Sequence, residues 1–511
     1  MYSQFNTLQM TTNLREYSEV KQRVEHGIKI LRSYSWLLDS FVLDFYIEKH
    51  WEKLPVKWRH LLDTVELDEL GCLLDYRNAN PSFKRVWPLS FLALRSAAHM
   101  LSVSRKQAES LNALFYKSNA HFEPTDNLHQ SSSNQIKLDN ISAGSMEDQI
   151  LGNEFIINPK FSHIFVKHVK PKKRHEVALM AKITAETAKS TGCSYVVDVG
   201  SGLGHLARML AYGYDLQVCC LEAQHTLAQQ ARKLDLELEV TMTKYISNDQ
   251  SLDFCRPVHV SNTLNSSVDE NYFVQVLKTA FGMENTDINF GIVGLHPCGD
   301  LGPLLLHLFI KCPNARFINI VGCCYMKLST SEQKNVVNFQ GYPLSNFISE
   351  QACSLSYEAR EIACHAIENY CERLCSGNVS HLKVHCYRAT LERLLVKFWP
   401  NLRHSGIRSI RHSNELPFDK YCHAATERLG VVLPEEEINS KETRDDLSQW
   451  KRVVIFYSLR LLLAPLVETV LLFDRLFYLL ELGLNGTLIP VFDPCLSPRN
   501  HILIATKQIN K

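Results

Sequence analysis

Hydrophobic and polar positions alternate with helical spacing over the first 120 residues of the chain. Apolar side chains recur there at steps of three and four, which predicts one long helix face. The residues on this face are Leu31, Tyr34, Leu38, Phe41 and Phe45. A further helix is predicted after Pro88, because proline is well tolerated in the first turn of a helix. We therefore expect a helical N-terminal region over residues 1–120, with apolar faces suited to a protein partner.

A polar stretch follows over residues 121–154. From Glu123 to Glu154 the chain has no aromatic residue, and a run of serines, 131–133, lies in its middle. Such a segment buries too little apolar area to offset the entropy of ordering it. We predict a linker or a long loop.

After Phe155 the pattern changes to short β-branched runs that alternate with helix-length segments. The predicted strands are Tyr195–Gly200, Leu216–Leu221, Asn289–Leu295 and Phe317–Gly322. The predicted helices are Lys172–Ser190, Leu206–Tyr212, Thr226–Leu234 and Leu301–Ile310. Strands that alternate with helices indicate a parallel, doubly wound sheet.

The C-terminus predicts an antiparallel hairpin formed by Thr487–Asp493 and His501–Thr506. Pro490 has no N–H to donate, which places its strand at a sheet edge. A parallel sheet closed by such a hairpin is typical of Rossmann-like class I methyltransferases, an α/β fold. The predicted units are the helical region 1–120, the linker 121–154, the first part of the core 155–330, a large helical insertion 331–449, and a closing helix with the hairpin 450–511.

Composition limits the partners and the compartment. Lys plus Arg total 55 and Asp plus Glu total 54, so the net charge of +1 excludes a polycation that coats nucleic acid by charge alone. Residues 1–13 lack the pattern of a secretory signal, so the 16 cysteines predict reduced thiols in the cytoplasm or nucleus. Charged residues interrupt the leucine-rich segment 453–484, which predicts a buried core helix, with a tail-anchored membrane span as the alternative.

A glycine-rich loop follows the first predicted strand. The spacing of Gly200, Gly202 and Gly204 permits a tight turn and a close approach of backbone to ligand. A dinucleotide fingerprint needs glycine where His205 stands, so the loop instead resembles motif I of S-adenosylmethionine-dependent methyltransferases. Glu222, at the end of the next strand, is suited to accept the ribose hydroxyls. The predicted cofactor-binding residues are Asp198, Gly200, Ser201, Gly202, Gly204 and Glu222.

Five segments carry a resemblance to a known family. They are Pro171–Glu176, Val197–His205, Gly294–Asp300, Gly322–Lys327 and Asp493–Asn500. Together they resemble the methyltransferase-like protein 25 family, which implies a methyltransferase of unassigned acceptor. Two of the segments are also similar to Trm13-type tRNA 2′-O-methyltransferases, but Cys323-Cys-Tyr-Met stands where those enzymes have Cys-Cys-His-His.

The acceptor side is predicted after the strands Asn289–Leu295 and Phe317–Gly322, the fourth and fifth strands of such a sheet. His296 and Asp300 are candidates for a base that takes a proton from the acceptor, and the alternative for His296 is a loop histidine that fixes a turn. The Asn/Asp-Pro-Pro-Tyr signature is absent, which argues against amide or N6-adenine methylation. Cys298 and Cys323 are further candidates, since one cysteine at each place is the arrangement of RNA cytosine-C5 methyltransferases. Arg499 and Asn500 are candidates for binding the acceptor or fixing the hairpin turn.

A zinc site formed by Cys298, Cys323 and Cys324, with Cys364 and His365, is an alternative use of these thiols. No Cys-x-x-Cys pair of zinc-ribbon spacing occurs, so we predict no metal and small buried thiols that line the cofactor pocket.

Two basic segments, 167–175 and 383–411, flank the predicted site. In the second segment, Lys and Arg residues are interspersed with Tyr387, Phe398 and Trp399. A groove that binds an RNA backbone combines basic and aromatic side chains in this way. A solvated helix face is the alternative for each segment. We predict an S-adenosylmethionine-dependent methyltransferase that acts on RNA. The alternatives are a protein methyltransferase and a non-catalytic cofactor-binding scaffold.

Overall fold

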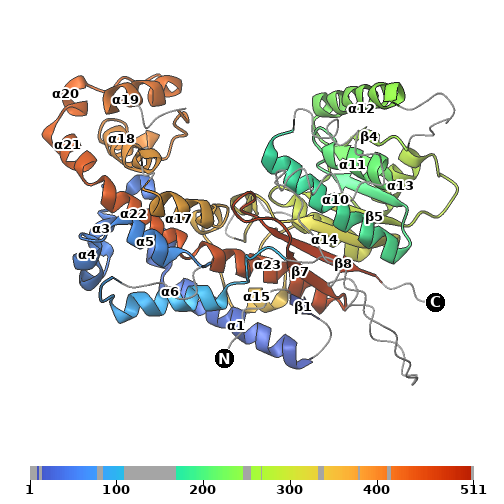
Figure 1. Cartoon of the computed structure of the whole chain (residues 1–511), viewed down its shortest axis with the longest axis horizontal. Helices are drawn as coiled ribbons and strands as arrows, with labels where there is room; N and C mark the ends of the chain where they lie inside the picture. Colours follow the sequence, from blue (N-terminus) through green and yellow to red (C-terminus); the bar gives the residue numbers. More distant parts are fainter. Residues whose placement is uncertain are drawn as a thin grey trace, which may run out of the picture.

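The computed structural model describes residues 8–10, 14–77, 84–108, 169–245, 255–265, 267–331, 339–377, 380–410 and 416–507. A sheet with its covering helices lies at one end of the molecule and a small helical lobe at the other (Figure 1). The closing helices run between them, and the N-terminal helices lie along the lower side of this view. The predicted linker 121–154 lies outside the described residues.

Within the described residues, eight strands form one sheet in the order β1-β7-β8-β6-β5-β2-β3-β4. Strands β2 to β6 pair in parallel, whereas β8 pairs antiparallel with β6 and β7. The strands are β1 (Leu8–Met10), β2 (Tyr195–Val199), β3 (Gln217–Glu222), β4 (Val258–Ser261), β5 (Phe290–Leu295), β6 (Ala315–Val321), β7 (Gly486–Pro490) and β8 (His501–Thr506). This parallel sheet with its terminal hairpin confirms the predicted Rossmann-like α/β fold.

Alternate residues of each strand point to opposite faces of the sheet and build two cores. Val196 packs into one core and Val197 into the other, and Cys220 and Cys219 repeat the alternation on β3. One face is covered by α10, α11 and α12, and the other by α13 and α14. The bounds are α10 (Pro171–Thr191), α11 (His205–Tyr214), α12 (His225–Tyr245), α13 (Glu270–Phe281) and α14 (Leu301–Lys311).

The strand order creates a switch point between β2 and β5. From β2 the chain moves outward through β3 to β4, and it then returns to the other side of β2 with β5 and β6. The two neighbouring connections therefore leave the strand ends in opposite directions and open a crevice there, where ligands bind in such sheets. The glycine loop after β2 and the loop after β5 both lie at this edge.

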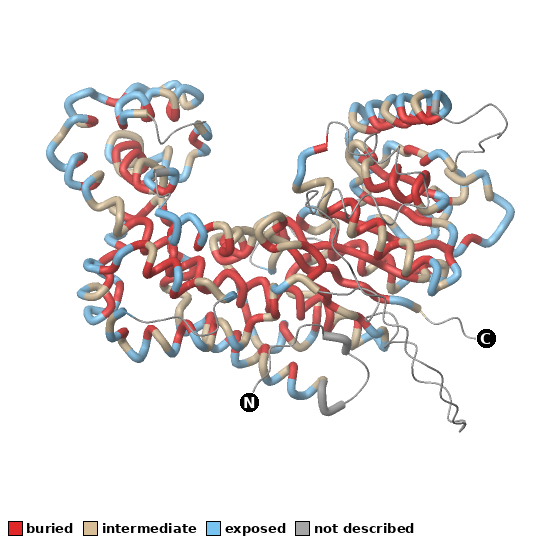
Figure 2. Tube along the Cα trace, in the orientation of Figure 1, coloured by how far each residue is buried: buried red, intermediate tan, exposed pale blue. Residues whose placement is uncertain are grey.

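The N-terminal helices and helices α15 to α17 share a core with the sheet, whereas α19 to α21 pack with α18 in a smaller core of their own. Helix α5 packs against α17, and α1 packs against α6 and α23. Figure 2 shows buried residues that run from the sheet through α23 to the N-terminal helices. The N-terminal helices are α1 (Leu14–Ser33), α2 (Ser35–Leu38), α3 (His50–Lys53), α4 (Val56–Leu62), α5 (Leu67–Leu74) and α6 (Leu89–Leu101). The later ones are α15 (Asn346–Glu350), α16 (Tyr357–Ile362), α17 (Ile367–Cys375), α18 (Val384–Phe398), α19 (Phe418–Thr426), α20 (Glu435–Ile438) and α21 (Lys441–Ser448).

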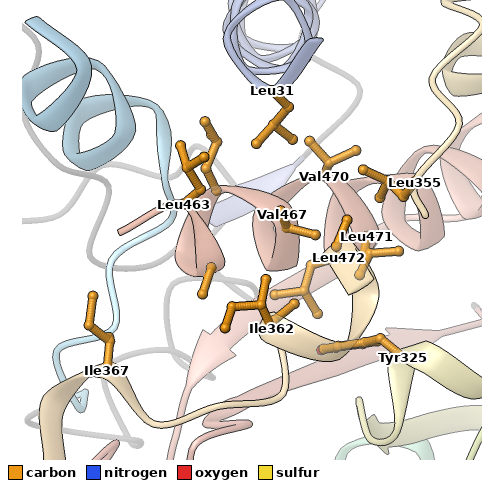
Figure 3. Packing of buried hydrophobic residues seen from close by; sticks show 14 of the residues in the cluster. Leu31, Tyr325, Leu355, Ile362, Ile367, Leu463, Val467, Val470, Leu471 and Leu472 are labelled. Atoms are coloured by element: carbon orange, nitrogen blue, oxygen red, sulfur yellow. The ribbon is translucent and has the colours of Figure 1, made fainter. Parts of the chain in front are cut away.

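The leucine-rich segment forms α22 (Trp450–Leu461) and α23 (Ala464–Glu481). By length and composition alone Trp450–Glu481 is apolar enough to cross a membrane, but its most apolar stretch is wholly buried inside the protein. In Figure 3, Val467 and Leu471 of α23 lie among residues from α1, α16 and the loop after β6. The structure therefore packs this segment as a pair of core helices.

Three local predictions are wrong. The apolar residues from Leu31 to Phe45 do not share one helix, because Tyr34 leaves the helical conformation (φ −113°, ψ 20°) and separates α1 from α2. The N-terminal region also contributes a strand, β1. β1 in turn covers β7, so the strand of Pro490 does not lie at the sheet edge. Proline is tolerated there because β1 pairs with residues 486–488 only and ends before Pro490.

Arg105 links three parts of this core. Its side chain is 9% exposed and forms ion pairs with Glu368 of α17, at 2.6 Å, and with Glu468 of α23. A further N–H of its guanidinium donates to the carbonyl oxygen of Pro498 in the hairpin turn, at 2.7 Å.

We expect Arg105→Ala to lower the free energy of unfolding by about 3–5 kcal/mol, because it leaves two buried carboxylates without their cation. Urea unfolding followed by circular dichroism measures the change. Arg256→Ala is the control: this arginine is 54% exposed in its pair with Glu239, so its loss should cost less than about 1 kcal/mol. Equal losses in both variants would contradict the linking role of Arg105.

Candidate functional site

The glycine loop leaves β2 with three residues in the left-handed region. The φ angles are +71° at Gly200, +58° at Gly202 and +70° at Gly204, and side chains rarely adopt such values. A Cβ at Gly202 would meet no atom within 4 Å, so space for a ligand lies above it. A Cβ at Gly204 would approach His259 to 3.0 Å, so that glycine allows α11 to pack closely. Ser201 lies half-buried between the first two glycines.

Glu222, at the end of β3, lies beside this loop. Its carboxylate accepts the N–H of Gly202 at 2.8 Å and the N–H of Gln224 at 2.9 Å. It is 8% exposed and stands on the strand next to β2, where the ribose of an adenosyl group would be held. The pairing of β2 with β3 thus brings Glu222, which is predicted to accept the ribose hydroxyls, next to the glycine loop.

Asp198 is a buried carboxyl group next to the loop. One of its oxygens is buried without a hydrogen-bond partner among the described residues. Burial raises the pKa of Asp198 to about 7, and the charge of Lys173 on α10 acts in the opposite direction. An unpaired acid in this position fits a ligand that carries positive charge, as the sulfonium and ammonium groups of S-adenosylmethionine do. The residues around the loop therefore fit that cofactor.

The acceptor side is organised around His296, which follows β5 and has a positive φ of 75°. Its Nε2 lies 3.0 Å from a carboxylate oxygen of Glu176 on α10, and the other oxygen of Glu176 accepts the hydroxyl of Ser497 at 2.7 Å. Burial alone would lower the pKa of His296, but the neighbouring thiol of Cys323 and the carboxylate of Glu176 raise it above its usual value. Burial would raise the pKa of Glu176, yet the same contact with His296 lowers it to about 2.

Asp300 holds a loop together. Its carboxylate accepts the N–H of Ser329 at 2.8 Å, and a Cβ at Gly341 would collide with it. Arg499 and Asn500 also serve the fold. Arg499 donates to the carbonyl oxygen of Cys364 at 2.7 Å. Asn500 donates to the carbonyl oxygen of Arg105 in the N-terminal region at 2.7 Å and, across the hairpin turn, to that of Phe492 at 3.3 Å.

Cys298 and Cys323 lie together, 3.5 Å apart, with Cys324 beside both. Cys323 is buried, but Cys324 is only half-buried and Cys298 is exposed, so the prediction of small buried thiols holds for one of the three. The Cys298 thiol donates to the Cys323 sulfur, and this contact, with that of His296, lowers the pKa of Cys323. His365 is turned away and bonds to Tyr457 and Glu361.

The second basic segment is largely neutralised by acids from other helices. Its aromatic residues pack into the small core of the α18–α21 lobe. The ion pairs are Arg393 with Asp446, Lys397 with Glu437, Arg403 with Asp44, and Arg408 with Glu427. In the first segment, residues 167–168 lie outside the described residues, and Lys170 to His175 enter α10.

Sequence reasoning gave no role to Glu176, the partner of His296. It lies 120 residues before His296, and no local pattern connects the two. The only available signal was its place in the segment Pro171–Glu176, one of those that carry the family resemblance.

We expect Gly202→Ala to weaken S-adenosylmethionine binding about tenfold or more, because the methyl group enters the open space above the loop. Calorimetric titration measures the affinity. The matched control is Gly282→Ala, which has a φ of +66° and no atom within 4 Å of its Cβ, but ends α13 away from the site. Both variants carry the same backbone strain, of about 1–2 kcal/mol. Unchanged binding in Gly202→Ala would place the ligand elsewhere.

The raised pKa of Asp198 predicts pH-dependent binding. Below about pH 7 the free protein holds a proton on this carboxyl, and a cationic ligand favours the ionised form, so binding releases the proton. The affinity for S-adenosylmethionine should therefore rise with pH between about pH 6 and pH 7.5. Calorimetry in two buffers of different ionisation enthalpy measures the released proton. Asp198→Asn should remove this release while the exposed control Asp215→Asn keeps it, and equal release in all three proteins would contradict the assignment.

In a comparison with known proteins, the part of the chain that forms this site matches a known domain family. Residues 172–331 match the family described as "Methyltransferase domain". The chain is 29% identical over 228 residues to the probable methyltransferase-like protein 25 of Mus musculus, and 29% identical over 227 residues to that of Homo sapiens. Each match covers 42% of this chain and 37% of the relative, so the chain spans a little over a third of their length.

A solved structure, the plantazolicin methyltransferase BpumL in complex with SAH, covers 59% of this chain and 90% of its own. Its identity is 13% and its TM-score 0.20, too low to support an inference. The matched domain contains the glycine loop, Glu222, His296 and the three cysteines, and it indicates S-adenosylmethionine as the cofactor. The predicted resemblance is thereby confirmed: this chain carries a methyltransferase domain and is similar to methyltransferase-like protein 25.

Proposed function

We propose that this protein transfers the methyl group of S-adenosylmethionine to RNA. The choice of RNA as acceptor rests on one observation. The first turn of α10 is basic, and it lies beside both the cofactor side and the acceptor side of the site. Lys173 acts on the pKa of Asp198 at the glycine loop, and Glu176, one helical turn on, contacts His296 at the acceptor side.

The two basic segments differ in position and in free charge: only the first lies at this edge of the sheet, whereas the second lies in the α18–α21 lobe at the other end of the molecule. Lys170 is exposed and Lys173 is half-exposed, and Lys172, also half-exposed, lies 3.7 Å from Glu176, while the second basic segment is mostly ion-paired. Of the two segments, the first therefore has the more cationic surface for the phosphates of an RNA strand. The same run of basic residues suits nuclear import, and we propose the cytoplasm or nucleus as its compartment.

The cofactor, when bound, supplies a methyl group on a positively charged sulfur. The chain's residues then have to hold the acceptor in line with it, which is the main source of rate in such a displacement. Glu176 fixes the ring of His296, as the orienting acid does for a catalytic base. We propose His296 as the group nearest the acceptor, with Asp300 and Arg499 as loop-fixing residues.

We expect the purified chain with tritium-labelled S-adenosylmethionine to label a ribonuclease-sensitive fraction of total cellular RNA. Glu222→Gln should remove most of the label, because the ribose loses a charge-assisted hydrogen bond worth about 1.5–3 kcal/mol. Label that only protease removes would favour a protein acceptor. Intact cofactor binding without any transfer would favour a non-catalytic scaffold.

Lysine variants test the RNA contact independently of turnover. Lys170→Ser/Lys172→Ser should reduce the slope of log affinity against log salt by about two, since two phosphate contacts are lost. Fluorescence anisotropy with a labelled RNA measures the slope. The control Lys49→Ser/Lys57→Ser removes the same charge from exposed positions on and beside the N-terminal helices. Equal slopes in the two double variants would rule out this surface.

A further inference from the structure

Three cysteine thiols from two separate loops meet at the acceptor side of the sheet. Cys298 follows β5, whereas Cys323 and Cys324 follow β6. The loops converge because β5 and β6 are neighbouring parallel strands, paired up to Leu295 and Val321. The sulfur–sulfur distances are 3.5 Å for Cys298 and Cys323, 3.4 Å for Cys298 and Cys324, and 3.6 Å for Cys323 and Cys324.

This triangle has nearly the shape of three corners of a zinc–thiolate tetrahedron. Zinc–sulfur bonds of about 2.3 Å at tetrahedral angles separate the sulfurs by about 3.8 Å, so each edge has to lengthen by only a few tenths of an ångström. A pair of thiols in contact is less informative, since Cys72 and Cys375 also lie 3.5 Å apart. Within the described residues, only the triad gathers three thiol ligands within mutual reach.

The backbone around the thiols is held in place. Gly299 (φ +59°) lets the first loop pass the second, because a Cβ there would lie 2.9 Å from the carbonyl oxygen of Lys327. Tyr325 anchors the second loop: its hydroxyl donates to Glu468 at 3.0 Å and its N–H donates to the sulfur of Cys364 at 3.3 Å. Loops fixed in this way present the sulfurs without a large loss of entropy on binding.

The surroundings suit the negative charge of a thiolate cluster. His296 lies near Cys323, and its Nε2 is 3.0 Å from a carboxylate oxygen of Glu176, so a carboxylate orients a ring beside the thiol cluster. The guanidinium of Arg499 also lies near Cys323, and Arg499 is fixed by the carbonyl oxygen of Cys364. A guanidinium beside the cluster partly offsets the net negative charge of three thiolates around a divalent ion.

We propose that Cys298, Cys323 and Cys324 bind one zinc ion, with water in the fourth position. Thiolate ligands favour zinc over magnesium or calcium, and three protein ligands with one exchangeable position are typical of catalytic zinc sites. The exposed thiol of Cys298 marks the side from which water or an acceptor atom reaches the ion. Binding replaces each S–H bond with a zinc–sulfur bond, releases the protons to solvent and moves no electrons.

The lack of Cys-x-x-Cys spacing in the sequence is explained by the topology. The triad joins positions 25 and 26 residues apart, and only the pairing of two strands makes them neighbours. The site is independent of the acceptor that we propose, because zinc binding is measured without methyl transfer.

The test is the zinc content of the full chain, purified without chelators and measured by inductively coupled plasma mass spectrometry. We expect one zinc ion per chain in the native protein and background zinc in Cys298→Ser, an exposed substitution that should leave the fold intact. Replacement of zinc by Co²⁺ should give the intense visible bands of a tetrahedral thiolate site. These bands should disappear in Cys298→Ser.

The matched control is Cys72→Ser/Cys375→Ser, which removes two contacting thiols outside the triad and should keep both the zinc and the cobalt spectrum. Circular dichroism and thermal melting establish that each variant is folded. Three outcomes would overturn the proposal: native protein without zinc, full zinc content in folded Cys298→Ser, or a disulfide between triad cysteines found by mass spectrometry of the freshly purified chain. Absence of RNA methylation alongside stoichiometric zinc would count against the proposed acceptor and leave the metal site standing.

Discussion

The buried carboxylate of Glu468, on α23, is the group on which the arrangement of the site depends. It pairs with Arg105 from the N-terminal region and accepts the hydroxyl of Tyr325, which directly follows the paired cysteines after β6. Arg105 also binds Glu368 of α17. A buried charge is tolerated only when its partners are fixed, so this contact ties the helical regions to the loop that faces the acceptor.

The switch point of the sheet separates two kinds of chemistry. On the β2–β3 side, Asp198 and Glu222 present carboxylates to the place where a cationic cofactor fits. On the β5–β6 side, His296 and the guanidinium of Arg499 lie near a group of soft thiols. Opposite local charges on neighbouring loops suit a reaction between a positively charged donor and an electron-rich acceptor, since each ligand is favoured on its own side.

The N-terminal helices and α15 to α17 are part of the core of the sheet, while α18 to α21 form a lobe with a smaller core. Figure 2 shows the buried interior continuing beyond the sheet, and α23 lies at its centre with contacts to α1, α6, α15 and α16. A segment apolar enough for a membrane thus serves as the shared interior of regions that are far apart in the chain. Buried polar side chains of this segment have hydrogen-bond partners on neighbouring parts of the fold: Asp474 accepts the N–H groups of Leu344 and Ser345 at 2.9 Å.

The sequence by itself determined the alternating elements, the glycine loop with Glu222, and the closing hairpin, because each depends on short-range periodicity, turn residues or strand spacing. Tertiary structure alone decided that Glu176 reaches His296, that Asp300 fixes a loop, and that Cys298 joins Cys323 and Cys324. It also neutralised the basic segment of α18 with acids from distant helices. Such contacts depend on which strands become neighbours and which helices cover them, and local sequence patterns carry no record of that choice.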